Sequence, residues 1–354
     1  MSRFFSQKYS NLEAYTPGEQ PKDMQYTKLN TNESPFPPSE KAQAYAAQAA
    51  HRLQLYCDPE CTVLTREFAQ LYGIGTDEVL FTNGSDDALN FAFMAFCDES
   101  HPAAFPDITY GFYPVFAELN HVPYVEIPLN DDFTINVDDY CGINQTIFIA
   151  NPNAPTGIAL SLSDIERILQ SNPDNVVIID EAYVDFGTDS AVGLIHTYDN
   201  LLVTQTFSKS RSLAGGRLGM AIGSASLIRD LNTIKYSTNP YNINTMTQAA
   251  GVGTILDDAY SRRNCAEIAD NRAYLTAELE KLGFTHTPST ANFVFAKHPS
   301  YDGERLYLEL KKRGVLIRHF TKERIRDYNR ITVGTKEQLD VLLKNIKEIL
   351  EETA

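Results

Sequence analysis

Four side chains in the middle of the chain could together hold one cofactor. Lys209 follows a run of β-type residues, and Arg217 lies eight residues further on. Upstream, the apolar run 176–179 leads into Asp180 and then Tyr183. The aldehyde of pyridoxal 5′-phosphate (PLP) needs an amine, its ring nitrogen needs an acid, and its phosphate needs an arginine. Each residue alone is more typical of a solvated surface or a turn, but together the four predict a PLP site.

The position of Asp180 carries most of this prediction. A carboxylate that directly follows four β-branched apolar residues is costly to bury unless a positive group pairs with it. A protonated pyridine nitrogen would pair with it and would keep the ring electron-poor. Tyr183, three residues further on, could donate a hydrogen bond to the phenolate oxygen of the same ring. We therefore expect Lys209, Asp180 and Tyr183 to be the catalytic residues.

The turn formed by Asn83, Gly84, Ser85 and Asp86 predicts an anion site. It follows a short apolar run and precedes a helical pattern. Free backbone N–H groups and the positive end of the helix dipole would point at this turn, and Ser85 adds a hydroxyl. The same pattern also suits an ordinary helix N-cap with acids in its first turn.

Two further segments follow apolar runs and could belong to the same site. Tyr110 could stack on a pyridine ring, although its local sequence is also typical of a core aromatic. The loop 151–157 reads Asn-Pro-Asn-Ala-Pro-Thr-Gly. Its two prolines allow a cis bond near a site, or the loop is only a turn.

Composition and charge exclude several classes of protein. The 354 residues are 43% apolar and 21% charged, which is ordinary for a soluble globular chain, and the net charge of −16 argues against nucleic-acid binding and against docking on anionic membranes. No window has the length of apolar sequence that a membrane span needs, and the first residues have no apolar signal core. We therefore expect a cytoplasmic protein.

The cysteines and histidines do not indicate a disulfide scaffold or a metal site. Five cysteines are an odd number in a long chain. Cys57 and Cys61 form one close pair, but no second pair completes a zinc set. The seven histidines have no metal-ligand spacing. We expect no metal.

The elements that must position these residues alternate between helical patterns and short apolar runs. Several runs are apolar on consecutive residues, which is typical of strands buried on both faces of a mostly parallel sheet. The predicted strands are 79–82, 103–105, 124–127, 146–150, 176–179, 201–206 and 220–222. They predict one doubly wound α/β sheet of seven strands. Ligands bind beyond the carboxyl ends of such strands, where the polar sets described above would meet.

The pattern of predicted helices and strands changes near residue 245. A long helical stretch over 247–282 is followed by predicted strands at 292–296, 315–318 and 330–333 and by helices at 303–313 and 336–351. We therefore expect three parts: an irregular, proline-rich N-terminal arm over 1–38, a large PLP-binding domain over 39–245 and a small α+β domain over 246–354. The arm should pack with the small domain, and Ser39 should begin a helix that reaches about residue 54.

Taken together, the motifs resemble those of the fold-type I PLP-dependent aminotransferases of class II, and more narrowly the chain is similar to the histidinol-phosphate aminotransferases. The resemblance runs nearly from end to end. It is carried by the segments 29–35, 56–59, 83–86, 151–157, 180–183, 206–209, 213–219, 240–242, 291–294 and 330–334. Each segment alone is weak to moderate evidence, but their order and spacing together indicate this fold and this cofactor.

The resemblance implies roles for individual residues. Lys209 would form the Schiff base, Asp180 would pair with the ring nitrogen, and Tyr183 would contact the phenolate oxygen. The remaining cofactor contacts implied are Tyr110 on the ring, and Gly84, Ser85, Asp86 through its backbone, Ser208 and Arg217 at the phosphate. Tyr56 would reach the phosphate of the partner subunit, which implies a homodimer with shared active sites.

The chain departs from the family pattern at Ala154. The family usually has an asparagine here, which contacts the phenolate oxygen. Either Asn153 replaces it as a cofactor-binding residue, or that hydrogen bond is missing and Tyr183 remains. For the substrate, the resemblance points to Arg318 and Arg330 as anion binders, helped by Tyr15, Asn32 and Tyr241.

The resemblance implies transamination between L-histidinol phosphate and 2-oxoglutarate, a step of histidine biosynthesis. A threonine-phosphate decarboxylase and an aromatic amino acid aminotransferase would show the same cofactor residues, and two arginines do not decide among these substrates. A nucleotide-binding α/β protein is the alternative from another class. It is weakly supported, because the turns at Gly84 and 215–219 have neither the Gly-x-Gly-x-x-Gly spacing nor a Gly-Lys-Ser/Thr ending.

Overall fold

The computed structural model describes residues 2–10 and 12–352. The strands are β1 (Thr27–Lys28), β2 (Val79–Thr82), β3 (Ala103–Pro106), β4 (Tyr124–Ile127), β5 (Thr146–Ala150), β6 (Val177–Asp180), β7 (Leu201–Thr206), β8 (Gly219–Gly223), β9 (Thr285–His286), β10 (Phe293–Lys297), β11 (Val315–Leu316), β12 (Arg318–His319) and β13 (Asn329–Thr332).

The α-helices are α1 (Glu40–Ala49), α2 (Thr62–Tyr72), α3 (Ser85–Phe96), α4 (Phe112–Asn120), α5 (Leu162–Ser171), α6 (Ala225–Thr238), α7 (Thr245–Ile255), α8 (Asp258–Lys281), α9 (Gly303–Lys312) and α10 (Lys336–Glu351). Short 3-10 turns are η1 (Gln7–Tyr9), η2 (Ala50–Arg52), η3 (Val137–Tyr140), η4 (Val184–Phe186), η5 (Ala191–Leu194), η6 (Ala214–Gly216) and η7 (Glu323–Ile325).

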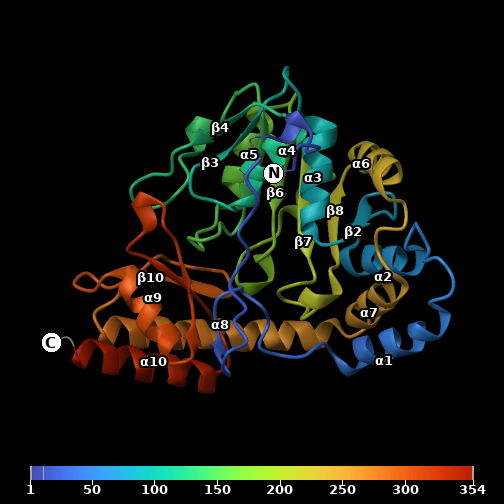
Figure 1. Cartoon of the computed structure of the whole chain (residues 1–354). Helices are drawn as coiled ribbons and strands as arrows, with labels where there is room; N and C mark the ends of the chain where they lie inside the picture. The colour runs from blue at the N-terminus through green and yellow to red at the C-terminus, as the bar shows by residue number, and fades with distance from the viewer. Residues whose placement is uncertain (1, 11, 353–354) are drawn as a thin grey trace.

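A seven-stranded sheet forms the large part of the molecule (Figure 1). Its order is β2-β8-β7-β6-β5-β3-β4, and only β8 runs antiparallel to its neighbours. The predicted mostly parallel α/β sheet of seven strands is therefore confirmed. Four of the seven predicted strands have the bounds that the structure shows; one of the other three differs by one residue at one end, and two differ by one residue at both ends.

The strands lie in the sheet because their consecutive apolar residues fill two cores, one on each face. In β5, Ile147 and Ile149 belong to one core, whereas Phe148 belongs to the other. In β6, Ile178 likewise faces away from Val177 and Ile179. The outermost strand β4 is an exception, because it lies at the sheet edge and its side chains are largely exposed.

A smaller four-stranded antiparallel sheet lies beside the large one, in the order β12-β13-β10-β9. It packs with α8, α9 and α10 around a third, separate core. Figure 1 shows α8 running along the base of the molecule, from the small sheet towards α7. The N-terminal arm passes between the two parts, and its strand β1 pairs in parallel with β11. The domain boundaries at 38 and 245 stay a prediction.

Three predicted elements differ from the structure. The single helix expected over 247–282 is two helices, because the chain leaves the helical path between Ile255 and Asp258. The strand expected over 315–318 is divided: β11 pairs with the arm and β12 with β13, so the chain changes partner at Ile317. The first helix begins at the predicted Ser39 cap but ends at Ala49, followed by η2.

Within the described residues, no helix is long and apolar enough to cross a membrane. The same part of the chain contains no cluster of three or more histidine, cysteine or acidic side chains that could hold a metal ion. All five cysteines are free thiols.

Candidate active site

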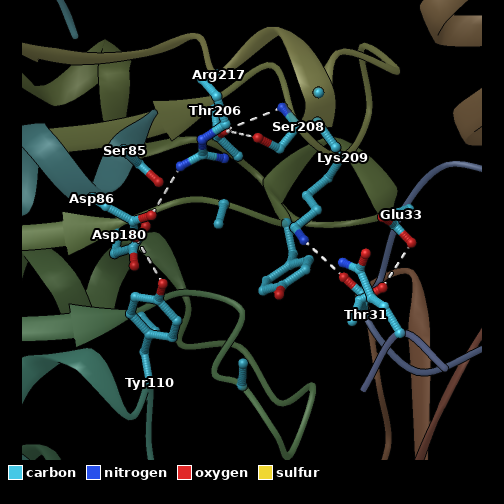
Figure 2. A pocket seen from close by; sticks show the side chains of 17 residues that line it. Thr31, Glu33, Ser85, Asp86, Tyr110, Asp180, Thr206, Ser208, Lys209 and Arg217 are labelled. Atoms are coloured by element: carbon cyan, nitrogen blue, oxygen red, sulfur yellow. Dashed lines mark hydrogen bonds and ion pairs between the residues drawn. The ribbon is translucent and has the colours of Figure 1, made fainter. Parts of the chain in front are cut away.

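A pocket of about 380 Å³ lies at the carboxyl ends of β6 and β7, where the sequence places its polar residues (Figure 2). Its walls come from the arm, the start of α3, the end of β6, and the segment between β7 and β8. The lining includes the predicted residues Ser85, Asp86, Tyr110, Asp180, Tyr183, Ser208, Lys209 and Arg217. The structure therefore brings together eight predicted site residues from five separate segments.

Asp180 is the most buried acid of this pocket. It ends β6 and is 4% exposed. Its Oδ2 accepts a hydrogen bond from Tyr113 Oη at 3.0 Å, and its Oδ1 accepts one from Thr204 Oγ1 at 3.1 Å. Burial raises the pKa of Asp180 to about 6, although both hydrogen bonds act in the opposite direction. A cationic partner in the pocket would remove the cost of this buried charge.

Lys209 follows β7 and points into the same pocket (Figure 2). Its Nζ donates to the carbonyl oxygen of Thr31 at 3.1 Å and lies 5.8 Å from the centre of the Tyr183 ring. The amine has no carboxylate within salt-bridge distance among the described residues. Lys209 is therefore held at the centre of the pocket by a backbone carbonyl of the arm.

The turn before α3 and Arg217 form the opposite end of the pocket. Gly84 has φ +80°, and a Cβ there would lie 2.5 Å from Arg217 Nη2, so only glycine lets the guanidinium approach this closely. Arg217 Nη2 donates to Asp86 Oδ2 at 3.0 Å. Ser85 is the first residue of α3, so free N–H groups point at the pocket. Ser208 also lines the pocket, on the same side as Arg217 (Figure 2).

Tyr110 lines the pocket beside the first turn of α3. Its hydroxyl donates to Asp86 Oδ1 at 2.7 Å, and burial together with the Asp86 charge holds its pKa well above the usual range. The side chain of Asp86 thus accepts from both Tyr110 and Arg217, in addition to any role of its backbone.

The geometry does not support the predicted contact from Asn153. Its Nδ2 donates to Ile108 O at 2.9 Å and to Thr156 Oγ1 at 3.0 Å, while its Oδ1 accepts from Thr109 at 2.8 Å. All these partners belong to loops outside the pocket lining, and Ala154 faces the pocket instead. In this structure the side chain of Asn153 therefore joins loops and does not line the pocket.

A wider cleft of about 760 Å³ opens from the pocket between the arm, the large sheet and the small domain. Arg318, Arg330 and Tyr15 line it, as the sequence predicts. Arg330 Nη2 donates to Asn30 O at 3.1 Å, whereas its buried Nε has no partner. No carboxylate of the described residues pairs with Arg330, and burial lowers its pKa. The cleft thus contains a guanidinium that lacks an anion.

Asn32, Tyr56 and Tyr241 line neither the pocket nor the cleft of their own chain. Asn32 does not line the pocket or the cleft; its Nδ2 donates to Tyr183 Oη at 3.0 Å. Tyr241 stacks on Tyr56 with ring centres 4.7 Å apart. These two rings are 44% and 85% exposed and lie outside the pocket of their own chain. The roles expected of Tyr56 at the partner subunit's cofactor and of Tyr241 at the substrate stay predictions.

Several site residues were missed by the sequence reasoning. Tyr113 and Thr204 hold Asp180, yet they come from α4 and β7, and no local pattern signals the contact. Thr31 and Glu33 also line the pocket, and Thr31 Oγ1 donates to Glu33 at 2.7 Å (Figure 2). The segment 29–35 was singled out as a motif, so its resemblance was a usable signal for these two residues.

The residues present fit PLP. A buried acid, an amine, a phenol and an arginine beside a helix N-terminus face one pocket, and each has the chemistry that one part of the cofactor requires.

Comparison with known proteins agrees with this fit. Residues 24–346 match the family model of class I and II aminotransferases. A histidinol-phosphate aminotransferase of Brachyspira hyodysenteriae is 48% identical over 99% of this chain and 100% of that protein, and one of Marinomonas sp. is equally similar, with 48% identity over the same shares.

Solved structures share the fold. The histidinol-phosphate aminotransferase of Sinorhizobium meliloti, in complex with PLP, has a TM-score of 0.85 at 20% identity and covers 92% of this chain and 91% of its own. The L-threonine-O-3-phosphate decarboxylase of Porphyromonas gingivalis has a TM-score of 0.81 at 20% identity and covers 92% and 99%. At this identity the fold does not separate the two activities. The near-full-length relatives at 48% identity do: this chain belongs to the histidinol-phosphate aminotransferases, within the PLP-dependent class I and II aminotransferase family.

Proposed function

We propose that this protein transfers the amino group of L-histidinol phosphate to 2-oxoglutarate, giving imidazole acetol phosphate and L-glutamate in histidine biosynthesis. The names of its relatives at 48% identity support this substrate pair. The observation that carries the proposal from the structure is Arg330. Its guanidinium lies in the cleft beside the pocket and has no carboxylate partner in the described chain.

Different residues of the pocket would bind different parts of the cofactor. Arg217, Ser208, Ser85 and the N–H groups at the start of α3 would hold the phosphate. Tyr110 would stack on the ring. When bound, PLP supplies an electron-poor ring that accepts the electrons released at the substrate α-carbon.

Three residues of the pocket, Asp180, Tyr183 and Lys209, would have the catalytic roles. Asp180 would hold the ring nitrogen in its charged form, because Tyr113 and Thr204 keep the carboxylate oriented. Tyr183 would donate to the phenolate oxygen. Lys209 Nζ would take the proton from the substrate α-carbon and deliver it to the C4′ carbon of the cofactor, acting as base and then as acid. The carbonyl of Thr31 would orient this amine between the two steps.

The cleft would bind both substrates through their anionic groups. Arg330, Arg318 and Tyr15 can engage a phosphate ester or a dicarboxylate, because a guanidinium forms paired hydrogen bonds with either anion. One cleft would then serve histidinol phosphate in one half-reaction and 2-oxoglutarate in the other.

We also propose a cytoplasmic homodimer with shared active sites. Tyr56 and Tyr241 form an exposed aromatic pair outside their own pocket, which would suit contact with a partner subunit. Five free thiols suit a reducing compartment.

The substrate is tested by comparing four amino donors: histidinol phosphate, histidinol, phenylalanine and threonine phosphate. Histidinol lacks the anion and should lose at least about 10³-fold in kcat/KM, because each charge-assisted hydrogen bond contributes about 1.5–3 kcal/mol. Arg330→Ala should remove most of this discrimination. The matched control is Arg313→Ala, because Arg313 pairs with Glu348 and Glu352 away from the cleft.

Two results would contradict the substrate assignment. A preference for phenylalanine would make the protein an aromatic aminotransferase, and release of carbon dioxide from threonine phosphate would make it a decarboxylase. Both outcomes would leave the PLP assignment intact.

A further inference from the structure

Asn32 is held in a single orientation by the strand β13. It lies in the left-handed region with φ 56° and is 1% exposed. Its backbone N–H donates to Thr332 Oγ1 at 3.0 Å, and Thr332 Oγ1 donates to Asn32 Oδ1 at 3.0 Å. Because the hydroxyl proton goes to Oδ1, the amide oxygen must face β13 and the amide nitrogen must face the other way.

That amide nitrogen donates to Tyr183 Oη at 3.0 Å. An amide N–H cannot accept a hydrogen bond in return, so the single proton of the phenol must be donated elsewhere. Among the described residues, the Tyr183 hydroxyl has no other partner, and Tyr183 lines the cofactor pocket. The hydrogen bond from Asn32 therefore leaves the phenol proton available to a group inside the pocket.

This arrangement bears on the departure at Ala154. The methyl group of Ala154 faces the pocket and has no donor, and Asn153 is occupied by neighbouring loops. The loop 151–157 thus donates no side-chain hydrogen bond into the pocket in this structure. The contact to the ring oxygen depends on Tyr183, and a phenol whose proton is directed is a stronger donor than one free to turn.

We propose that Asn32 is a positioning residue that directs the Tyr183 proton to the phenolate oxygen of PLP. One directed tyrosine would then supply the contact for which related enzymes also use an asparagine. The inference rests on the proposed role of Tyr183 and changes the role of Asn32 from substrate binding to orientation of a cofactor ligand.

The test measures binding to the full chain freed of cofactor, by equilibrium dialysis of PLP and of 3-deoxypyridoxal 5′-phosphate, which lacks the ring oxygen. The change in the ratio of the two dissociation constants between wild type and variant isolates the protein contact to that oxygen, because effects within the cofactor itself are the same in every variant. We expect the wild type to prefer PLP by about tenfold to hundredfold, the effect of one hydrogen bond to a charged group.

Asn32→Asp should abolish most of this preference. Aspartate keeps the shape and tolerates the positive φ, but its carboxylate accepts the Tyr183 proton. Tyr183→Phe should cause the same loss, and Asn32→Asp should add nothing in that background. Asn32→Gly provides a second variant compatible with the backbone, and should lower the preference about threefold or more, since the hydroxyl is then free to turn.

The matched control is Asn329→Asp, a buried amide of β13 that donates to Gly303 O at 2.9 Å and lies outside the pocket; it should keep the wild-type preference. An unchanged preference for PLP in both Asn32 variants would overturn the role of Asn32 but not that of Tyr183. So would a loss of preference on Asn32→Asp that is as large in the Tyr183→Phe background as in the wild type. A wild type without any preference would instead overturn the role of Tyr183, and the donor comparison above tests the reaction separately.

Discussion

Removing one hydroxyl, in Tyr113→Phe, should change how the stability of the cofactor-free protein depends on pH. Tyr113 is fully buried, and its Oη donates to Asp180 Oδ2 at 3.0 Å. Phenylalanine keeps the ring and its packing, so the substitution removes only this hydrogen bond. A hydrogen bond to a charged group contributes about 1.5–3 kcal/mol, and about 1.4 kcal/mol corresponds to one pH unit. The pKa of Asp180, now about 6, should therefore rise by about one to two pH units.

The sign follows from the protons bound in each state. An unfolded aspartate has a pKa near 3.9, below the folded value of about 6, so the folded protein holds more protons between these two values. The free energy of unfolding therefore falls as pH rises through this window and is level above it. In Tyr113→Phe the free energy of unfolding should continue to fall up to about pH 7–8. Relative to the wild type, the free energy of unfolding of the variant should thus be little changed at pH 5 and lower by about 1.5–3 kcal/mol at pH 8.

The assay is denaturant unfolding of both proteins without cofactor, at one protein concentration, in steps from pH 5 to pH 8.5. Tyr140→Phe is the matched control, because Tyr140 is 1% exposed and its hydroxyl has no partner among the described residues. The difference in free energy of unfolding between Tyr140→Phe and the wild type should not vary with pH. A difference for Tyr113→Phe that is the same at every pH would show that the hydroxyl does not act on the Asp180 charge, and would refute the argument.

Three other outcomes follow from the site. Lys209→Ala should keep the fold but lose the visible absorbance of the lysine-bound cofactor and several orders of magnitude in turnover; normal transamination by this variant would disprove the role of the lysine. Asp180→Asn should slow single-turnover transamination by roughly 10²-fold or more, because it removes the charge that pairs with the ring nitrogen; an unchanged rate would make the acid structural. Verified heterodimers of Tyr56→Ala with Lys209→Ala should regain part of the activity if the sites are shared, whereas no recovery would place each site within one chain.

The strand ends could be predicted because their signal is local. Consecutive β-branched residues mark strands buried on both faces, and the polar residue that follows lies at the carboxyl end of the sheet. Asp180 and Lys209 were found in this way, and the structure places both in the same pocket. The turn at Gly84 was found because its glycine and the helix that follows are adjacent in sequence.

The contacts that join distant segments could not be predicted in the same way. Tyr113 meets Asp180 across 67 residues, and Asn32 meets Tyr183 across 151. Asn153 was expected in the pocket from its place next to Ala154, but its amide has three partners in adjoining loops. One residue along a turn reverses the direction of a side chain, and only the packed loops decide which residue faces inward.

Asp180 in the pocket and Arg330 in the cleft are both charged groups without a partner of opposite charge, an arrangement that is uncommon in the rest of the described chain. Asp180 is a buried carboxylate without a cation, and Arg330 is a guanidinium with a buried, unpartnered Nε and no carboxylate. Each raises the free energy of the folded protein, since burial shifts both pKa values against the charged form. A ligand that supplies a cationic ring nitrogen at one end and a carboxylate or phosphate at the other would remove both costs at once. Ligand binding would thus remove an unfavourable free energy that the folded protein already contains. This explains why the charges of Asp180 and Arg330 are unpaired in the protein alone, although buried charges are usually paired.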